Sequence, residues 1–447
     1  MNLVPLKRMP TQLFRSATLE IDTDFTAEDP LAFDYLGQQV GNWLFRGFTT
    51  RTSRAQYYCV VLYGLHLAEV AIQQYGYPGD DKTRSLLFER WERFWALATL
   101  ESRGGTLERG DPDGMRGVRG AQAAWIGGDR ALRLDYPLIS RQVELGGMGA
   151  YLSSLREYGL VFKGTLRVTP LAKPFVDFFW TSKTKSSGNR YERYALKALD
   201  LERRTIPRAV SGLSLKRVGD RSRLTAVKKR PDQQERLWSI LFAQAKDGST
   251  LPISQQLVSA DNDGEVVIEQ ILRGILRNKW GEVDSTVEQR VRAAIAFGKL
   301  STHLLSCFDR AYGYVDSHGW IADFRHVASA AFPESESATT RNLCNAVQKA
   351  SGCRKFGELK FHGPQFLSLV SKLMDAGPAE ALEYLLAFHV AVQRTRRGSG
   401  AWFRREKTKL VMQVVGYGGF RKEQHFPSFK LNVVRRLLAD LGRLNDD

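Results

Sequence analysis

The chain has 447 residues, of which 43% are hydrophobic and 11% aromatic, and it carries a formal net charge of +17. This much apolar surface excludes a disordered chain, because its burial can offset the ordering entropy of folding, and the length favours two to four domains. The four cysteines are scattered, which excludes a disulfide framework and regular zinc-finger spacing and favours a reducing cytoplasm.

The N-terminal residues lack the apolar segment of a signal peptide. The most apolar run begins at Tyr57 and stops after about sixteen residues, whereas a membrane-spanning helix needs roughly twenty. We therefore expect a buried helix here and no association with a membrane.

Positive charge is concentrated in two segments. Residues 181–230 contain fifteen Lys or Arg and four acidic residues, and residues 391–447 contain thirteen and five. The rest of the chain carries about −2. Such segments favour a polyanionic partner, since each neutralised phosphate releases condensed counterions. The alternative is a solvated charged face that keeps the protein in solution.

Residues 44–63, LFRGFTTRTSRAQYYCVVLY, join an Arg- and Thr-rich turn to an apolar helix. The segment resembles, without a gap, a stretch of an uncharacterised bacterial family of unknown function that is associated with phage-defence gene clusters. The matching positions are Leu44, Phe45, Gly47, Thr49, Thr50, Arg54, Ala55, Tyr57 and Tyr58.

The chain departs from that family's pattern at Arg46, where the family tends to have proline, and at Leu62-Tyr63, where it tends to have Pro-Trp. A looser match covers residues 117–120 and the segment LREYGL, so the resemblance spans roughly the first third to two fifths of the chain. It implies a role in antiviral defence.

Two arginines lie at the predicted start of the apolar helix. We expect Thr and Ser side chains to cap this helix near Ser53, which places Arg51 and Arg54 at its positive end. An anion such as phosphate would stabilise this arrangement. Alternatively, Arg54 pairs with a carboxylate of the same domain, such as one from residues 29–34.

Helical periodicity dominates most of the chain. Residues 85–102 carry an apolar stripe through Leu87, Trp91, Phe94 and Trp95. Residues 286–315 form a long candidate helix, and residues 363–397 form a candidate helical hairpin broken at Gly377-Pro378. A polar loop, PESESATT, is expected near residue 335.

The central segment has the element order of a winged helix. A short helix at 138–144 ends at a Gly-Gly turn, and a second helix follows at 148–158. Gly159 ends that helix, residues 160–168 form a hairpin that turns at 163–165, and Thr169-Pro170 starts another helix.

Met148, Leu152 and Leu155 share one face of the second helix and are expected to pack inward. The remaining side chains of the helix and the hairpin would contact phosphates and base edges of DNA: Tyr151, Ser153, Ser154, Arg156, Lys163 and Arg167. The alternative is a winged helix that only docks other proteins.

Two further segments suit nucleic acid. The basic arm after the hairpin ends in Lys228, Lys229 and Arg230, which would contact phosphates. Near the C-terminus, basic residues surround an aromatic pair, an arrangement that suits stacking on single strands. The predicted contacts there are Arg396, Arg397, Trp402, Arg404 and Arg405. A charged loop anchored by a buried Trp402 is the alternative.

One segment of the sequence carries a candidate catalytic pair. In KFGELKF, Glu358 and Lys360 would share one strand face, as the metal ligand and the cation of a restriction-type nuclease do, but a surface strand explains the segment more simply. The histidines show no HxH or HxxxH spacing, and no phosphate-binding loop is present. We expect no catalytic residue, no metal and no cofactor.

Together these patterns predict a mainly α (α+β), multidomain, cytoplasmic protein with a central winged helix. We expect a non-catalytic DNA-binding subunit of a prokaryotic defence system with a helicase or nuclease partner, the alternatives being a metal-dependent nuclease and a protein-docking adaptor. The predicted segments are an N-terminal helical domain at 1–110, the winged helix at 111–182, a basic arm at 183–232 and a C-terminal helical domain with a basic tail at 233–447.

Overall fold

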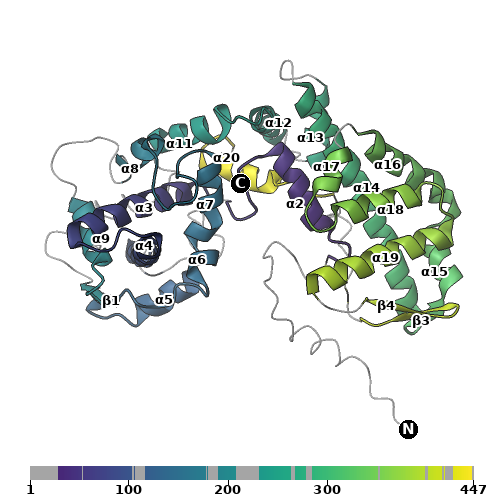
Figure 1. Cartoon of the computed structure of the whole chain (residues 1–447), viewed down its shortest axis with the longest axis horizontal. Helices are drawn as coiled ribbons and strands as arrows, with labels where there is room; N and C mark the ends of the chain where they lie inside the picture. The colour runs from purple at the N-terminus through teal and green to yellow at the C-terminus, as the bar shows by residue number, and fades with distance from the viewer. Residues whose placement is uncertain are drawn as a thin grey trace, which may run out of the picture. The chain divides into compact units, whose positions relative to one another are not determined.

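The computed structural model describes residues 29–52, 54–102, 105, 116–177, 179, 190–207, 231–262, 267–277, 284–350, 353–397, 401–414, 417 and 426–444. It is mainly helical with two small sheets, which confirms the predicted helical class (Figure 1). The chain forms two compact units, and both are discontinuous in sequence. Unit 1 comprises residues 1–45 and 265–431, and unit 2 comprises residues 46–264 and 432–447.

Unit 2 is built on two long helices, α3 (Ala55–Tyr75) and α4 (Asp81–Ser102). The predicted stripe of α4 is confirmed as core, since Leu87, Trp91, Phe94 and Trp95 are all at most 1% exposed. The two helices approach closely at Gly64, where an added Cβ would lie 2.1 Å from Trp91 Cδ1. Glycine is therefore required at this crossing, because any side chain would displace the buried indole.

Helix α3 is longer than its apolar run predicts. It has 21 residues, and within the described part of the chain it is the one helix long and apolar enough to cross a membrane. However, 83% of its most apolar window is buried inside the protein, which is typical of the core helix of a soluble protein. The predicted buried helix is confirmed, and at 21 residues it is longer than the apolar run predicts.

The remaining elements of unit 2 surround this pair. A two-stranded antiparallel sheet joins β1 to β2, with Leu132 opposite Ile206. The segment predicted as a winged helix lies in this unit with residues 46–110 of the predicted N-terminal domain, and α7 packs on α3. Residues 1–45 of that predicted domain belong to unit 1. The elements are α5 (Val118–Ile126), β1 (Ala131–Arg133), α6 (Gln142–Leu145), α7 (Gly147–Glu157), η2 (Pro170–Ala172), α8 (Lys173–Asp177), α9 (Arg190–Leu199), β2 (Thr205–Pro207), α11 (Pro231–Trp238), the π-helix η4 (Ser239–Ala243), α12 (Thr250–Asn262) and α20 (Leu431–Asp440).

Unit 1 is organised around α14 (Ser285–Ser317), the long helix that the sequence predicts. An aromatic cluster forms its core, in which Phe33 contacts Phe297, Phe366 and Phe388. The predicted helical hairpin is confirmed as α18 and α19. The elements are α2 (Phe33–Leu44), α13 (Ile268–Leu276), α14, β3 (Ile321–Asp323), α15 (Phe324–Ala331), η5 (Glu334–Glu336), α16 (Ser337–Lys349), α17 (Cys353–Glu358), α18 (Gly363–Leu373), α19 (Pro378–Arg397), β4 (Phe403–Glu406) and β5 (Lys409–Met412), with sheet order β3-β5-β4.

Two local predictions in unit 1 are wrong. The segment KFGELKF is not a strand: α17 runs to Glu358, because the fully buried Phe356 packs against Phe297 and Phe366. The segment PESESATT is not a loop throughout, since it forms η5 and the first turn of α16. In both places tertiary packing overrides a weak local pattern.

Candidate nucleic-acid interface

The predicted helix and hairpin around residue 160 are present. Helix α7 ends at Glu157, and Gly159 follows with φ +70°, a left-handed conformation that favours glycine. Val161 pairs with Val168 in an antiparallel bridge, and the turn between them contains Gly164 at φ +77°. The Thr169 N–H donates to Leu160 O at 2.9 Å, which closes the base of the hairpin.

One side chain joins the helix to the hairpin. Arg156 on α7 is half-buried, and its Nη2 donates to Thr165 O at 2.8 Å. The guanidinium therefore holds the hairpin turn against the last turn of α7. The predicted contact residues Ser153, Lys163 and Arg167 are exposed, as expected of groups that reach a ligand.

Two predicted DNA contacts are wrong. Tyr151 and Ser154 are at most 1% exposed, because α7 buries this face as well as Met148 and Leu155. Leu152, the third residue of the predicted stripe, is only partly buried. Ser154 Oγ lies 2.8 Å from the Tyr58 hydroxyl. The Tyr151 hydroxyl accepts from Arg54 N and donates to Arg54 O, both at 3.0 Å. These buried hydroxyls hydrogen-bond α7 to the start of α3 and do not face solvent.

Acidic groups interrupt the positive surface beside the hairpin. Glu157, on the exposed face of α7, lies 2.6 Å from the exposed Arg46. On α8, Lys173 pairs with Asp177 at 2.9 Å. The hairpin adds two exposed cations, Lys163 and Arg167.

The arginine pair before α3 is held by protein groups. Arg54 forms an ion pair with Asp440 at 2.9 Å, so its partner is a carboxylate of its own unit, as the alternative prediction held, but not one from residues 29–34. The Asp440 carboxylate also accepts from Ala55 N at 2.8 Å, where a local Ser or Thr cap was expected. Arg51 Nη1 lies at 3.5 Å from Glu144 O. A phosphate is therefore not needed to balance the start of α3.

The C-terminal aromatic site is also different from the prediction. Trp402 is 3% exposed and lies against Phe308, His389 and Tyr417, so it cannot stack on a nucleic-acid base. The alternative is confirmed in that Trp402 is buried, but the charged residues after it form β4 and not a loop.

The charges beside Trp402 have protein partners. Arg404 pairs with Glu406, and Arg405 pairs with Glu383 at 3.3 Å and lies over the Phe324 ring. Arg396 and Arg397 lie in the last turn of α19. The predicted basic-arm contacts Lys228, Lys229 and Arg230 lie outside the described residues.

The weak catalytic pair is not arranged as a nuclease requires. Glu358 ends α17 and Lys360 lies in the turn after it, where the Lys360 N–H donates to Gln39 Oε1 at 2.8 Å. Both side chains are exposed. Residues 353–361, which the structure describes, contain no strand that would align them. Among the described residues, one group of metal-ligating side chains lies together elsewhere in unit 1: His303, Cys307 and Glu336.

No protein-family model, curated protein or solved structure matches the chain. Sequence reasoning missed three features of this surface: Arg46, Phe162 and Leu171, whose side chains are exposed. Phe162 follows the first strand of the hairpin, and Leu171 follows the Thr-Pro turn. Both lie in elements too short to have a periodic pattern, so the sequence does not predict which of their faces is exposed. His303 and Cys307 could have been found by a search for ligands at i and i+4 of the long helix.

Proposed function

We propose that this protein binds duplex DNA through the exposed face of α7 and the hairpin 160–169, in the manner of a winged helix. The observation that carries the proposal is the hairpin itself. It presents Lys163 and Arg167 to solvent, and the Arg156 guanidinium fixes its turn to α7 through Thr165 O. A preordered turn lowers the entropy cost of binding, because the backbone that carries the two cations is already fixed.

The helix order α5, α6, α7 followed by a hairpin supports the winged-helix assignment. One feature differs from a compact winged helix, since β1 pairs with β2 at 205–207 and not with the hairpin. The winged-helix class therefore rests on the local order of elements.

The mode of binding follows from what α7 leaves exposed. Ser153 and the half-buried Arg156 remain on its accessible face, whereas Tyr151 and Ser154 are buried and Glu157 would repel phosphate. Few groups can therefore read base edges. Contacts from Lys163 and Arg167 to phosphates would dominate, so we expect strong salt dependence and little sequence preference.

A second function is favoured by a specific observation. Two large apolar side chains, in the hairpin and just after it, are about half exposed, Phe162 at 48% and Leu171 at 50%. Exposed apolar groups beside a polar rim are typical of a protein-docking surface. The adaptor role is therefore the alternative to DNA binding, whereas the exposed Glu358 and Lys360 do not favour a nuclease.

The biological setting rests on the resemblance of residues 44–63 alone. We propose a cytoplasmic, non-catalytic subunit of a prokaryotic antiviral defence system that works with a helicase or nuclease partner. The geometry of the hairpin supports the DNA-binding part of this proposal. The helicase or nuclease partner is to be identified by experiment.

Binding of the full chain to duplex, forked and single-stranded DNA, measured by fluorescence anisotropy across a salt series with and without magnesium, tests the proposal. Lys163→Glu with Arg167→Glu should weaken duplex binding and reduce the slope of log K against log salt by about 2. The matched control, Arg292→Glu with Lys349→Glu, reverses the same charge at exposed positions of unit 1. If both double variants lose the same DNA affinity, net charge and not the hairpin accounts for the effect. If Lys163→Glu with Arg167→Glu loses no DNA affinity, the protein-docking function is favoured.

A further inference from the structure

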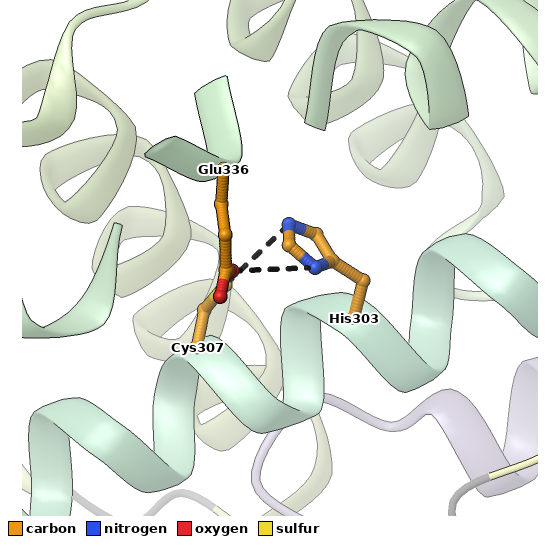
Figure 2. Close-up of side chains that lie close together, drawn as sticks. All are labelled: His303, Cys307 and Glu336. Atoms are coloured by element: carbon orange, nitrogen blue, oxygen red, sulfur yellow. Dashed lines mark hydrogen bonds and ion pairs between the residues drawn. The ribbon is translucent and has the colours of Figure 1, made fainter. Parts of the chain in front are cut away.

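Three metal-ligating side chains converge in unit 1, whereas the hairpin belongs to unit 2. His303 and Cys307 lie one turn apart on α14 and project toward Glu336 of η5 (Figure 2). Their ligand atoms all lie within 4.8 Å of one another. Cys307 Sγ is 3.7 Å from His303 Nε2, and His303 Nδ1 is 3.9 Å from Glu336 Oε2.

The hydrogen bonds of Thr340 assign the His303 tautomer. The Thr340 hydroxyl donates to Glu336 O at 3.2 Å, so its oxygen is left to accept from His303 Nε2 at 2.8 Å. Nε2 then carries the proton, and the lone pair of Nδ1 points toward the Glu336 carboxylate. A ring nitrogen fixed by a hydrogen bond on its far side is the usual arrangement of a metal-bound histidine.

A protein cation already contacts two of these ligands. Arg310 Nη2 lies 2.8 Å from Glu336 Oε2 and 3.3 Å from Cys307 Sγ. The same guanidinium donates to Ala331 O through Nη2 at 2.7 Å and through Nε at 3.2 Å. Arg310 Nη2 can therefore move away from the carboxylate and the sulfur while the Nε bond to Ala331 O keeps the side chain nearby.

We propose that His303, Cys307 and Glu336 form a three-ligand site for a divalent transition-metal ion, zinc by ligand type, which competes with Arg310 for Glu336 and Cys307. Sulfur, imidazole and carboxylate together select zinc over magnesium or calcium, and three protein ligands leave a fourth position for water. Binding replaces the S–H bond of Cys307 with a sulfur–metal bond, and the proton passes to solvent. Arg310 Nη2 loses its contacts with Cys307 and Glu336, and the Nε bond to Ala331 O remains.

Cobalt reports on the site directly, because a thiolate–cobalt bond gives a charge-transfer band in the near ultraviolet. The full chain, freed of metal by a chelator and kept reduced, should develop this band with one equivalent of Co²⁺ and lose it when Zn²⁺ is added. Cys307→Ser should abolish the band, whereas Cys59→Ser, at a buried cysteine of unit 2, should retain it. Glu336→Gln should weaken binding by roughly tenfold or more.

Arg310→Gln separates a metal site from a hydrogen-bonded cluster that merely stabilises unit 1. Removal of the competing cation should strengthen cobalt binding by about tenfold, an effect of the size that groups beside metal ligands exert. Absence of the band in the folded parent protein, or its persistence in Cys307→Ser, would overturn the proposal. If Arg310→Gln only lowers the melting temperature and still gives no band, the cluster is structural.

Discussion

The carboxylate of Asp440 pairs with the Arg54 guanidinium at 2.9 Å and accepts the first N–H of α3 from Ala55 at 2.8 Å. Both charged side chains are largely buried, at 20% and 12% exposure. A cation at the positive end of a helix is unfavourable. The Asp440 carboxylate offsets this repulsion, because it interacts with both the Arg54 guanidinium and the first N–H of the helix. The start of α3 is thus capped by a residue 385 positions away in the sequence.

Asp440→Ala should lower the free energy of unfolding by about 3 kcal/mol or more, because it leaves a buried guanidinium without its partner. Asp440→Asn should cost less, since the amide oxygen still accepts from Ala55 N. Denaturant unfolding of the two variants checks this order. If both lose the same amount, the charge of Asp440 and not its capping bond accounts for the whole effect.

Tyr151→Phe and Ser154→Ala should change stability and leave DNA affinity unaltered. Each removes a buried hydroxyl bond, at a cost of about 1 to 3 kcal/mol. Neither side chain reaches solvent. Melting temperature and duplex affinity are measured on the same samples, at a temperature where both variants are folded. A folded Tyr151→Phe protein with reduced affinity would show that α7 opens this face on binding.

Trp402→Ala should destabilise the protein by about 3 to 5 kcal/mol, because it empties an aromatic cluster that includes Phe308 and Tyr417. Arg404→Ala, at a side chain 64% exposed, should change stability by under about 0.5 kcal/mol. Thermal unfolding distinguishes them. If single-stranded DNA protects Trp402 fluorescence from a soluble quencher in the folded protein, the stacking interpretation would be restored.

The buried carboxyl group of Asp29 should make stability depend on pH. Burial first, and the neighbouring Asp34 charge second, raise the pKa of Asp29 to about 7. Between about pH 4 and pH 7 the folded protein therefore holds a proton that the unfolded chain has released. Stability from this group is complete below about pH 4 and is lost as pH rises through about 7.

Asp29→Asn removes this contribution, so its unfolding free energy relative to the parent should rise with pH by up to about 1.4 kcal/mol per unit between pH 4 and 7. The buried His389, whose pKa is lowered by burial to about 4, acts in the opposite direction in both proteins and cancels from the difference. Denaturant unfolding at several pH values measures it. A difference that is constant with pH would mean that Asp29 is ionised in the folded state.

Glu358→Gln should leave folding and DNA binding unchanged, because the side chain is exposed at the end of α17. Any magnesium-dependent cleavage by the purified chain should also persist. Cleavage that disappears from this variant while DNA binding remains would make the nuclease interpretation correct.

Local signals account for the parts that the sequence predicts well. Gly159, Gly164 and Pro170 each mark a turn through their own backbone preferences, and the hairpin appears where they place it. The sequence also predicts the aromatic stripe of α4, since residues on one face of a helix recur with a fixed period.

The predictions that fail depend on distant partners. Tyr151 and Ser154 look like surface residues by spacing, yet Arg54 and Tyr58, about a hundred positions away, take up their hydroxyls. The alternation in KFGELKF predicts a strand, but the segment begins as the end of α17, because Phe356 packs against Phe297 of α14. In each case a periodic pattern identifies one buried face and cannot reveal a second.

The interleaved course of the chain has a consequence for synthesis on the ribosome. Unit 2 takes residues from 46 to 264 and then again from 432 onward, so α3 is made long before the carboxylate that caps it. Folding during translation normally proceeds one domain after another from the N-terminus. Here the apolar α3 emerges while Asp440 is still to be translated, and a nascent chain stalled shortly before α20 should engage chaperones that bind exposed apolar segments.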